Sequence, residues 1–244
     1  MTGAFLTAEW RDLVMLNYPV ERALLRPLVP PGVELDEFAS TTYVSVVGFL
    51  FLQTRVFGVA FPFHRNFEEV NLRFYVRHRG PEGWLRGVVF IKEIVPRRAI
   101  AGLARICYGE PYSAYPMSHS IAREDGQLHC RYAWRRKGRE EFVAASATGA
   151  PALVAPGSLE EFITEHYWGY TARRGRCAQY QVEHSPWRVW AARESHFDAD
   201  VAGLYGRGFA EPLSVPPASA FIAEGSPVVV RRGRALASTP LVAD

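Results

Sequence analysis

The chain of 244 residues is 48% hydrophobic, 13% aromatic and 22% charged, which is enough apolar material for one substantial core. We expect a single domain over residues 1–244, with disorder only at its ends, because no linker or low-complexity tract interrupts the sequence. The formal net charge of +3 comes almost entirely from arginine, and no basic stripe interleaved with aromatic residues is present, so no nucleic-acid partner is predicted.

Segments rich in Val, Phe, Leu and Tyr, each bounded by turns that contain Gly or Pro, predict β-strands. These segments are Trp10–Tyr18, Thr41–Val56, Asn71–His78, Trp84–Ile94 and Leu128–Trp134. Charged turns that contain glycine recur in the motifs HRGPEG, REDGQ, RRKGRE and TARRGR. Glycine supplies positive φ in tight turns, so these motifs predict antiparallel hairpins.

Helices are predicted to be few and short. Pro19 opens one that runs to Leu28 and stops at a Pro-Pro-Gly sequence. Ser158 and Glu161 form a capping box for a second helix, whose apolar stripe ends at His166. A third covers Ala199–Tyr205. Long strands with few helices indicate an α+β, mainly antiparallel β fold.

The strand predicted over Asn71–His78 alternates between two faces. One face carries Asn71, Arg73, Tyr75 and Arg77. This polar face either meets solvent, as is common in antiparallel sheets, or lines a cavity. In a cavity, the guanidinium of Arg73 beside the phenol of Tyr75 would clamp a carboxylate.

The segment ARICYGEPYSAYPM, residues 104–117, places Tyr112 and Tyr115 beside prolines that stiffen the backbone. Such an aromatic loop forms either the wall of a binding cavity or a packed plug at a sheet edge. The first role suits Tyr112 better, and the second suits Tyr115 better. Arg105 lies in an apolar run and would be costly to bury unpaired, so it reaches water or meets Glu110 or a ligand carboxylate.

A possible acid–base pair comes from two segments that are distant in sequence. Glu165 ends the capped helix, and His184 lies at the end of a strand, before Trp187. Brought together, a Glu and a His can share proton transfer, because burial shifts their pKa values toward neutrality. A structural histidine beside a Pro-Trp turn is the alternative interpretation.

Cysteine usage and the amino terminus predict a reduced cytoplasmic protein without a membrane partner. Cys107, Cys130 and Cys177 are widely separated, which indicates neither a disulfide framework nor a zinc site. The start of the chain lacks the pattern of a signal peptide, and the longest apolar stretch, Val44–Leu52, is too short to span a bilayer. No histidine spacing suits a metal and no glycine motif suits a nucleotide, so we expect no metal or cofactor.

Three segments together resemble the bacterial DUF2071 or YqjF-like family: NLRFYV, AR…YGEPY…PM and TEHYWGY…VEHSPW. The resemblance covers most of the chain. It implies the fold of acetoacetate decarboxylase, in which curved antiparallel sheets close into a cone or double barrel around a small-molecule cavity. The decarboxylase uses a Schiff-base lysine. The comparable PYSAYPM loop has none, and Lys92 and Lys137 each lack an adjacent lysine, so that mechanism is not implied here.

These observations lead to two functional hypotheses. In the first, a cavity holds a small carboxylate or keto-acid-like molecule, with Arg73 or Arg105 as anchor and Tyr75, Tyr112 and Trp187 as walls, and Glu165 with His184 carries out a lyase, isomerase or hydrolase step.

In the second hypothesis the same cavity belongs to a non-catalytic binding or sensing module. A purely structural interaction protein would instead show no cavity and a broad apolar patch. Assembly of identical chains is compatible with each of these hypotheses.

Overall fold

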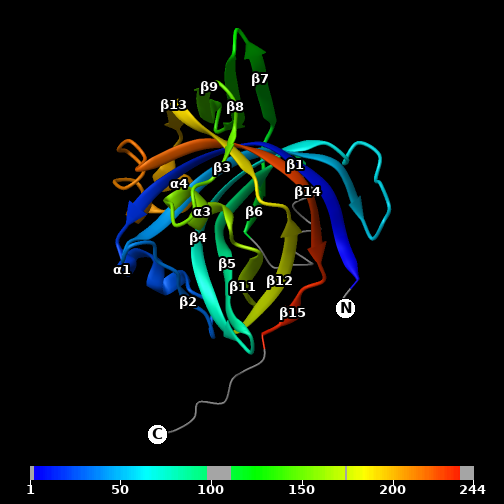
Figure 1. Ribbon diagram of the computed structural model, residues 1–244, viewed down its shortest axis with the longest axis vertical. Coiled ribbons are helices and arrows are strands. Elements are labelled where there is room, and N and C mark those ends of the chain that lie inside the picture. The colour runs from blue at the N-terminus through cyan, green and yellow to red at the C-terminus, as the bar shows by residue number, and fades with distance from the viewer. Residues whose placement is uncertain (1–2, 98–110, 174, 237–244) are drawn as a thin grey trace, which may run out of the picture.

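The computed structural model describes residues 3–97, 111–173 and 175–236. Strands dominate it, as the sequence predicts, and seven of them form a closed ring of neighbours (Figure 1). The ring consists of β1 (Ala4–Val20), β3 (Thr42–Val56), β4 (Phe67–Gly80), β5 (Gly83–Val95), β11 (Trp168–Arg173), β12 (Arg176–His184) and β14 (Ser219–Arg231). All contacts within the ring are antiparallel except the parallel pairing of β11 with β5.

The ring closes because β14 changes its neighbour halfway along. Its first half pairs with β13 (Arg188–Asp198), as at Ala223 opposite Val189, and its second half pairs with β12, as at Val230 opposite Val182. Gly225 lies between the two halves with φ of 80°. A Cβ there would lie 2.0 Å from the carbonyl oxygen of Trp10 on β1, so only glycine permits this change of direction.

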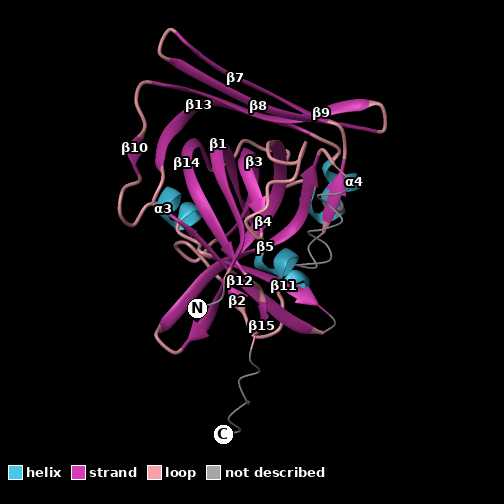
Figure 2. Cartoon of the chain, turned by 90° about the vertical axis from the view of Figure 1, so that its right-hand side faces the viewer, coloured by secondary structure: helices cyan, strands magenta, loops and turns pink. Residues whose placement is uncertain are grey.

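A second, smaller sheet lies across one end of the ring (Figure 2). It continues from β13 through β9 (Arg139–Thr148) and β8 (Gln127–Arg136) to β7 (Met117–Glu124). The predicted hairpin turns are confirmed here, since Asp125-Gly126 and Lys137-Gly138 both have positive φ at two successive residues. Four short strands pair with β4, β5, β13 and β12 instead of with β7, β8 or β9. They are, in the same order, β2 (Glu34–Leu35), β6 (Tyr112–Ala114), β10 (Ala152–Leu153) and β15 (Arg234–Ala235).

The helices are few and short, but the first begins later than predicted. Pro19 belongs to β1, where it pairs with Tyr43, and the helix α1 (Arg22–Leu25) is followed by a 3₁₀ turn (Arg26–Leu28). Strand pairing therefore overrides the helix-start signal of the proline.

The second and third helices agree with the sequence. In α3 (Leu159–Thr164) the side chain of Ser158 accepts a hydrogen bond from the Glu161 amide, as predicted. His166 lies beyond this helix and not on its stripe. The helix α4 (Val201–Tyr205) precedes a 3₁₀ turn (Arg207–Phe209). No helix in the described ranges has the length and apolarity needed to cross a bilayer.

Both faces of β4 are buried in its central part, so of the two alternatives for its polar face the solvated one does not hold and the cavity lining does. Leu72 and Phe74 face outward from the ring into a core shared with Tyr132 of the second sheet. On the opposite face, Asn71 is 2% exposed and Arg73 is 9% exposed. The polar face of this strand thus points into the ring.

Candidate functional site

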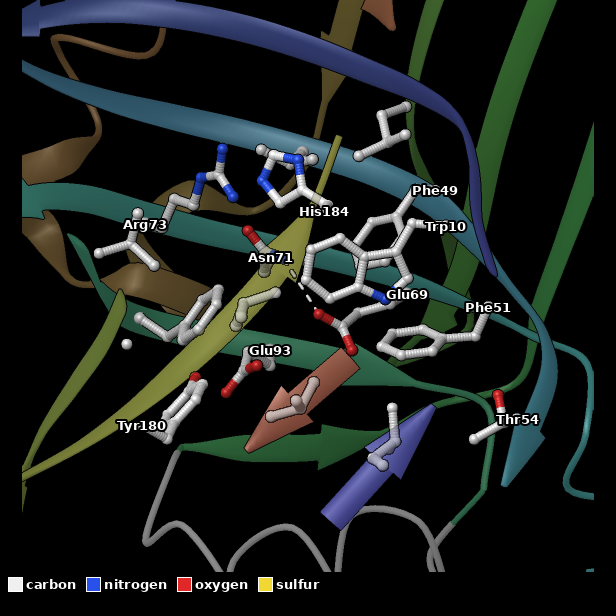
Figure 3. A pocket seen from close by; sticks show the side chains of 18 of the residues that line it. Trp10, Phe49, Phe51, Thr54, Glu69, Asn71, Arg73, Glu93, Tyr180 and His184 are labelled. Atoms are coloured by element: carbon white, nitrogen blue, oxygen red, sulfur yellow. Dashed lines mark hydrogen bonds between the residues drawn. The ribbon is translucent and has the colours of Figure 1, made fainter. Parts of the chain in front are cut away.

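The interior of the ring contains a cavity of about 360 Å³ (Figure 3). Its walls come from β1, β3, β4, β5, β6, β11, β12 and β14, together with the segment that follows α3. Most of the lining is apolar and aromatic. Polar side chains come from several elements, and the buried Glu69, Asn71 and Arg73 of β4 form one group with Glu93 on β5. A few polar groups in an apolar wall are the pattern of a pocket that orients a small molecule.

Four alternate residues of β4 point into the cavity: Phe67, Glu69, Asn71 and Arg73. The side-chain amide of Asn71 donates a hydrogen bond of 3.0 Å to Glu69. The hydroxyl of Tyr112, on β6, donates to the same carboxylate at 3.4 Å. Tyr112 therefore lies in the cavity wall, in the position that its proline-flanked loop suggests.

Arg73 is a buried cation in the lining. Its Nη2 donates one long hydrogen bond of 3.4 Å to the carbonyl oxygen of Ile163, and its Nε has no partner among the described residues. No carboxylate within the described ranges lies close enough to Arg73 to form an ion pair. A buried guanidinium in this state is costly unless another acceptor reaches it.

His184 is held between two aromatic rings at the cavity wall. Its ring stacks on Trp187 at 4.3 Å between centroids and lies 4.7 Å from Tyr167. Since the carbonyl oxygen of Ser185 can only accept, the contact of 2.9 Å with Nδ1 places a proton on Nδ1 and leaves Nε2 as the basic nitrogen. Burial lowers the pKa of His184 below its ordinary value, and the charge of Arg73 adds to this effect. The imidazole is therefore neutral at pH 7.

Glu165 does not form a hydrogen bond with His184 in the described structure. Its carboxylate accepts a hydrogen bond from the hydroxyl of Tyr167, and it lies outside the cavity lining. Its influence on His184 is electrostatic, because its negative charge opposes the fall in the pKa of the imidazole. The two predicted acid–base residues are thus neighbours with one aromatic side chain between them.

Tyr75 lies behind the wall of the cavity. It is 1% exposed, its hydroxyl is hydrogen-bonded to Ser45, and its ring packs 4.7 Å from that of His166. It supports the site and does not line it. The remaining predicted binding residue, Arg105, lies outside the described residues.

His166 is a lining residue that the sequence did not single out. Its Nε2 lies 3.3 Å from the carboxylate of Asp36, and its Nδ1 has no partner in the described part of the chain. Burial lowers the pKa of His166 to about 4, and the charges of Arg86 and Arg73 add to this, while the hydrogen bond to Asp36 opposes it. The helical periodicity of the preceding segment hid this residue, because it made the histidine look like one more member of an apolar stripe.

Glu69 and Glu93 were also missed as lining residues, although a signal for Glu69 exists. Extending the alternation of β4 by two residues toward the amino terminus places Glu69 on the face of Asn71 and Arg73. Glu93, on β5, is 1% exposed and lies opposite Asn71 in the register of the two strands.

Neither lysine of the chain lies in the cavity wall. Lys92 is on β5 but outside the lining, and Lys137 is exposed at the turn between β8 and β9. Cys130 and Cys177 have free thiols, and burial raises the pKa of Cys177 to about 11 and that of Cys130 to about 12. The described ranges contain no cluster of three or more His, Cys, Asp or Glu side chains that could hold a metal ion.

Sequence comparison supports the predicted family. The DUF2071 model, which describes an uncharacterized conserved protein, matches residues 7–227. The uncharacterized protein YqjF of Bacillus subtilis strain 168 is 30% identical over 182 residues, which are 73% of this chain and 72% of that protein.

Solved structures that resemble the chain share the predicted fold. Acetoacetate decarboxylase from Legionella pneumophila matches 97% of this chain and 88% of its own, with a TM-score of 0.65 and 13% identity. The enduracididine biosynthesis enzyme MppR in complex with pyruvate matches 97% of this chain and 91% of its own, with a TM-score of 0.68 and 16% identity. The chain therefore belongs to the DUF2071 family and has the acetoacetate decarboxylase-like fold.

Proposed function

We propose that the protein binds a small organic acid, a carboxylate or keto acid, inside the ring of strands and that Arg73 is its anchor. The observation that carries this proposal is the buried guanidinium of Arg73, whose Nε has no partner among the described residues. A carboxylate would supply two acceptors in the geometry that the guanidinium prefers and would neutralise its charge.

Other features of the cavity agree with an organic acid. Tyr112 and Trp187 provide aromatic walls, and Asn71 adds an amide beside the anchor. MppR, a structural neighbour, has been solved in complex with pyruvate, which is a keto acid. Arg105, the alternative anchor that the sequence predicts, lies outside the described residues.

Substitution of the anchor tests the binding proposal. Arg73→Met should weaken the binding of small 2-oxo acids by about ten- to a hundredfold, because a hydrogen bond to a charged group contributes about 1.5–3 kcal/mol. Titration calorimetry measures the dissociation constants. Arg77→Met is the matched control, since Arg77 lies on the same strand but pairs with Glu34 at the surface. Equal affinities in the wild type and Arg73→Met would refute the anchor.

We propose, as a finer function, that the site catalyses a lyase, isomerase or hydrolase step that needs proton transfer but no lysine amine. The specific support is the neutral imidazole of His184, whose Nε2 can accept a proton while Trp187 and Tyr167 hold the ring. Glu165 would favour the protonated form through its charge. The alternative is a non-catalytic binding or sensing module.

Turnover separates these two alternatives. Proton NMR of 2-oxo acids incubated with the wild-type protein should show loss of substrate or exchange of the proton next to the carbonyl. His184→Phe should abolish this change and leave binding within about threefold, because it keeps an aromatic ring against Trp187. Tight binding without any chemical change in the wild type would favour the sensing module.

A further inference from the structure

The cavity has two chemically different ends. Figure 3 shows Arg73 and Asn71 toward one side and Phe51 and Thr54 toward the other. Three aromatic side chains form the second side. The indole of Trp10 lies 5.3 Å from the ring of Phe49 and 5.7 Å from the ring of Phe51, measured between ring centres. The guanidinium of Arg73 thus lies at one end of the site, and the carboxylate of Glu69 lies between Asn71 and the aromatic side chains.

The size of the cavity exceeds that of a three-carbon keto acid. At about 30 Å³ for each water-sized group, such an acid would fill no more than about half of the space. The cavity volume is about 360 Å³. A small acid held at Arg73 would leave the aromatic end in contact with water, which is unfavourable in proportion to the apolar area exposed.

The aromatic end leads toward the connection between β3 and β4, residues 57–66. Phe61 of this connection lines the cavity and is 49% exposed to solvent. Phe63, two residues later, is 84% exposed and does not line the cavity. The apolar lining therefore extends from the interior to the protein surface along one direction.

Two polar atoms interrupt the aromatic end. Nε1 of Trp10 and Oγ1 of Thr54 are buried without a partner among the described residues. A hydroxyl or ether oxygen in a ligand could meet them. They do not alter the apolar character of the surrounding wall, where the rings of Phe51 and Phe67 stack at 4.7 Å.

From this division we infer that the ligand is amphipathic: an organic acid whose carboxylate meets Arg73 and whose alkyl or aryl part lies along Trp10, Phe51 and Phe67 toward Phe61. The inference rests on the proposed binding function and adds the class of ligand. Burial of the apolar part would supply affinity, and Arg73 would set the orientation.

A homologous series of unbranched 2-oxo acids tests the inference, with dissociation constants measured by calorimetry below the concentrations at which the acids aggregate. The affinity should rise about fourfold for each added methylene group until the aromatic end is filled. Phe61→Ser should weaken the binding of the long acids and leave the short acids unchanged. Phe63→Ser, the matched control in the same connection, should leave the whole series unchanged.

The outcomes distinguish this inference from the proposal on which it rests. If affinity does not depend on chain length but Arg73→Met still weakens binding by about tenfold or more, the amphipathic ligand is refuted and the anchor stands. If alcohols of the same length bind as tightly as the acids in both the wild type and Arg73→Met, the apolar site stands and the anchor is refuted. If no member of the series binds, both are overturned.

Discussion

Two buried arginines of nearly equal exposure have opposite surroundings. Arg136, at the end of β8, is 8% exposed and Arg73, on β4, is 9% exposed. Arg136 donates to Asp200 at 2.8 Å and to the carbonyl oxygen of Gly203 at 2.9 Å. Arg73 donates one long hydrogen bond to the carbonyl oxygen of Ile163 and lies 5.8 Å from the centre of the Tyr75 ring, and its Nε has no partner among the described residues. Two arginines can thus be equally buried and still differ in how completely their hydrogen-bonding groups are satisfied, and it is the incomplete set at Arg73 that motivates the proposed anchor.

The surroundings of Arg136 form a complete network. Glu141, 3.6 Å from Arg136, accepts a hydrogen bond from the indole of Trp134 at 2.6 Å and another from the amide of Asp200 at 3.0 Å. The hydrogen bond from Arg136 lowers the pKa of the Asp200 carboxyl. This network ties α4 to the second sheet and needs no ligand.

The largest expected effect is on folding stability. Arg136→Met should lower the free energy of unfolding by about 3–5 kcal/mol, because it leaves the buried Glu141 without its cation. Arg73→Met should change it by no more than about 1 kcal/mol, since no acid loses a partner. Urea denaturation measures both. Similar losses in the two variants would show that Arg73 is also a structural residue.

A second expected effect depends on pH. The pKa of His166 in the folded protein, about 4, lies below its ordinary value of 6.5. As the pH falls, the imidazole of His166 is therefore protonated in the unfolded chain before it is protonated in the folded protein. The contribution of His166 to folding stability is present above pH 6.5 and is lost as the pH falls toward 4. The loss should reach about 3 kcal/mol.

His166→Gln isolates this contribution, because glutamine cannot titrate but keeps an N–H for Asp36. Urea denaturation measured at several pH values between 7 and 4 should show that the free energy of unfolding falls less steeply in the variant than in the wild type. The contribution of His184, whose pKa is also lowered, is common to both proteins. An identical decline would mean that His166 is not buried in its neutral form.

The smallest expected effect concerns the helix that presents Ile163 to Arg73. Ser158→Ala should reduce stability by about 1 kcal/mol, because the amide of Glu161 loses its cap, and Ser158→Asp should retain most of it. Thermal denaturation gives the difference, and calorimetry should show unchanged ligand affinity. A loss of affinity in Ser158→Ala would mean that the helix start, and not only Arg73, controls the site.

Much of the fold could be predicted locally. The alternation of β4, the hairpin glycines Gly126 and Gly138, and the cap at Ser158 each depend on residues a few positions apart. The predicted helix start at Pro19 was wrong because a long strand pairing with β3 outweighs the local preference of a proline. Local preference is decisive only where no distant partner competes.

The candidate site was predicted in part, for the same reason. Arg73, Tyr112, His184 and Trp187 line one cavity, whereas Glu165 and Tyr75 lie beside it. His166 was missed because its role depends on Asp36, which lies far away in the sequence. A contact of this kind leaves no trace in the spacing of either residue.

The sequence by itself determined the strand-rich fold class, the alternation of faces along the predicted strands, the hairpin turns and, by resemblance, the family. Only the tertiary structure decided that the polar face of β4 is an interior surface, because this depends on the pairing of β12 with β14, which closes the ring. Periodicity tells which residues share a face but not whether that face meets water. Closure removes solvent from Arg73, and the burial of a guanidinium with a single long hydrogen bond is why we propose this residue as the anchor.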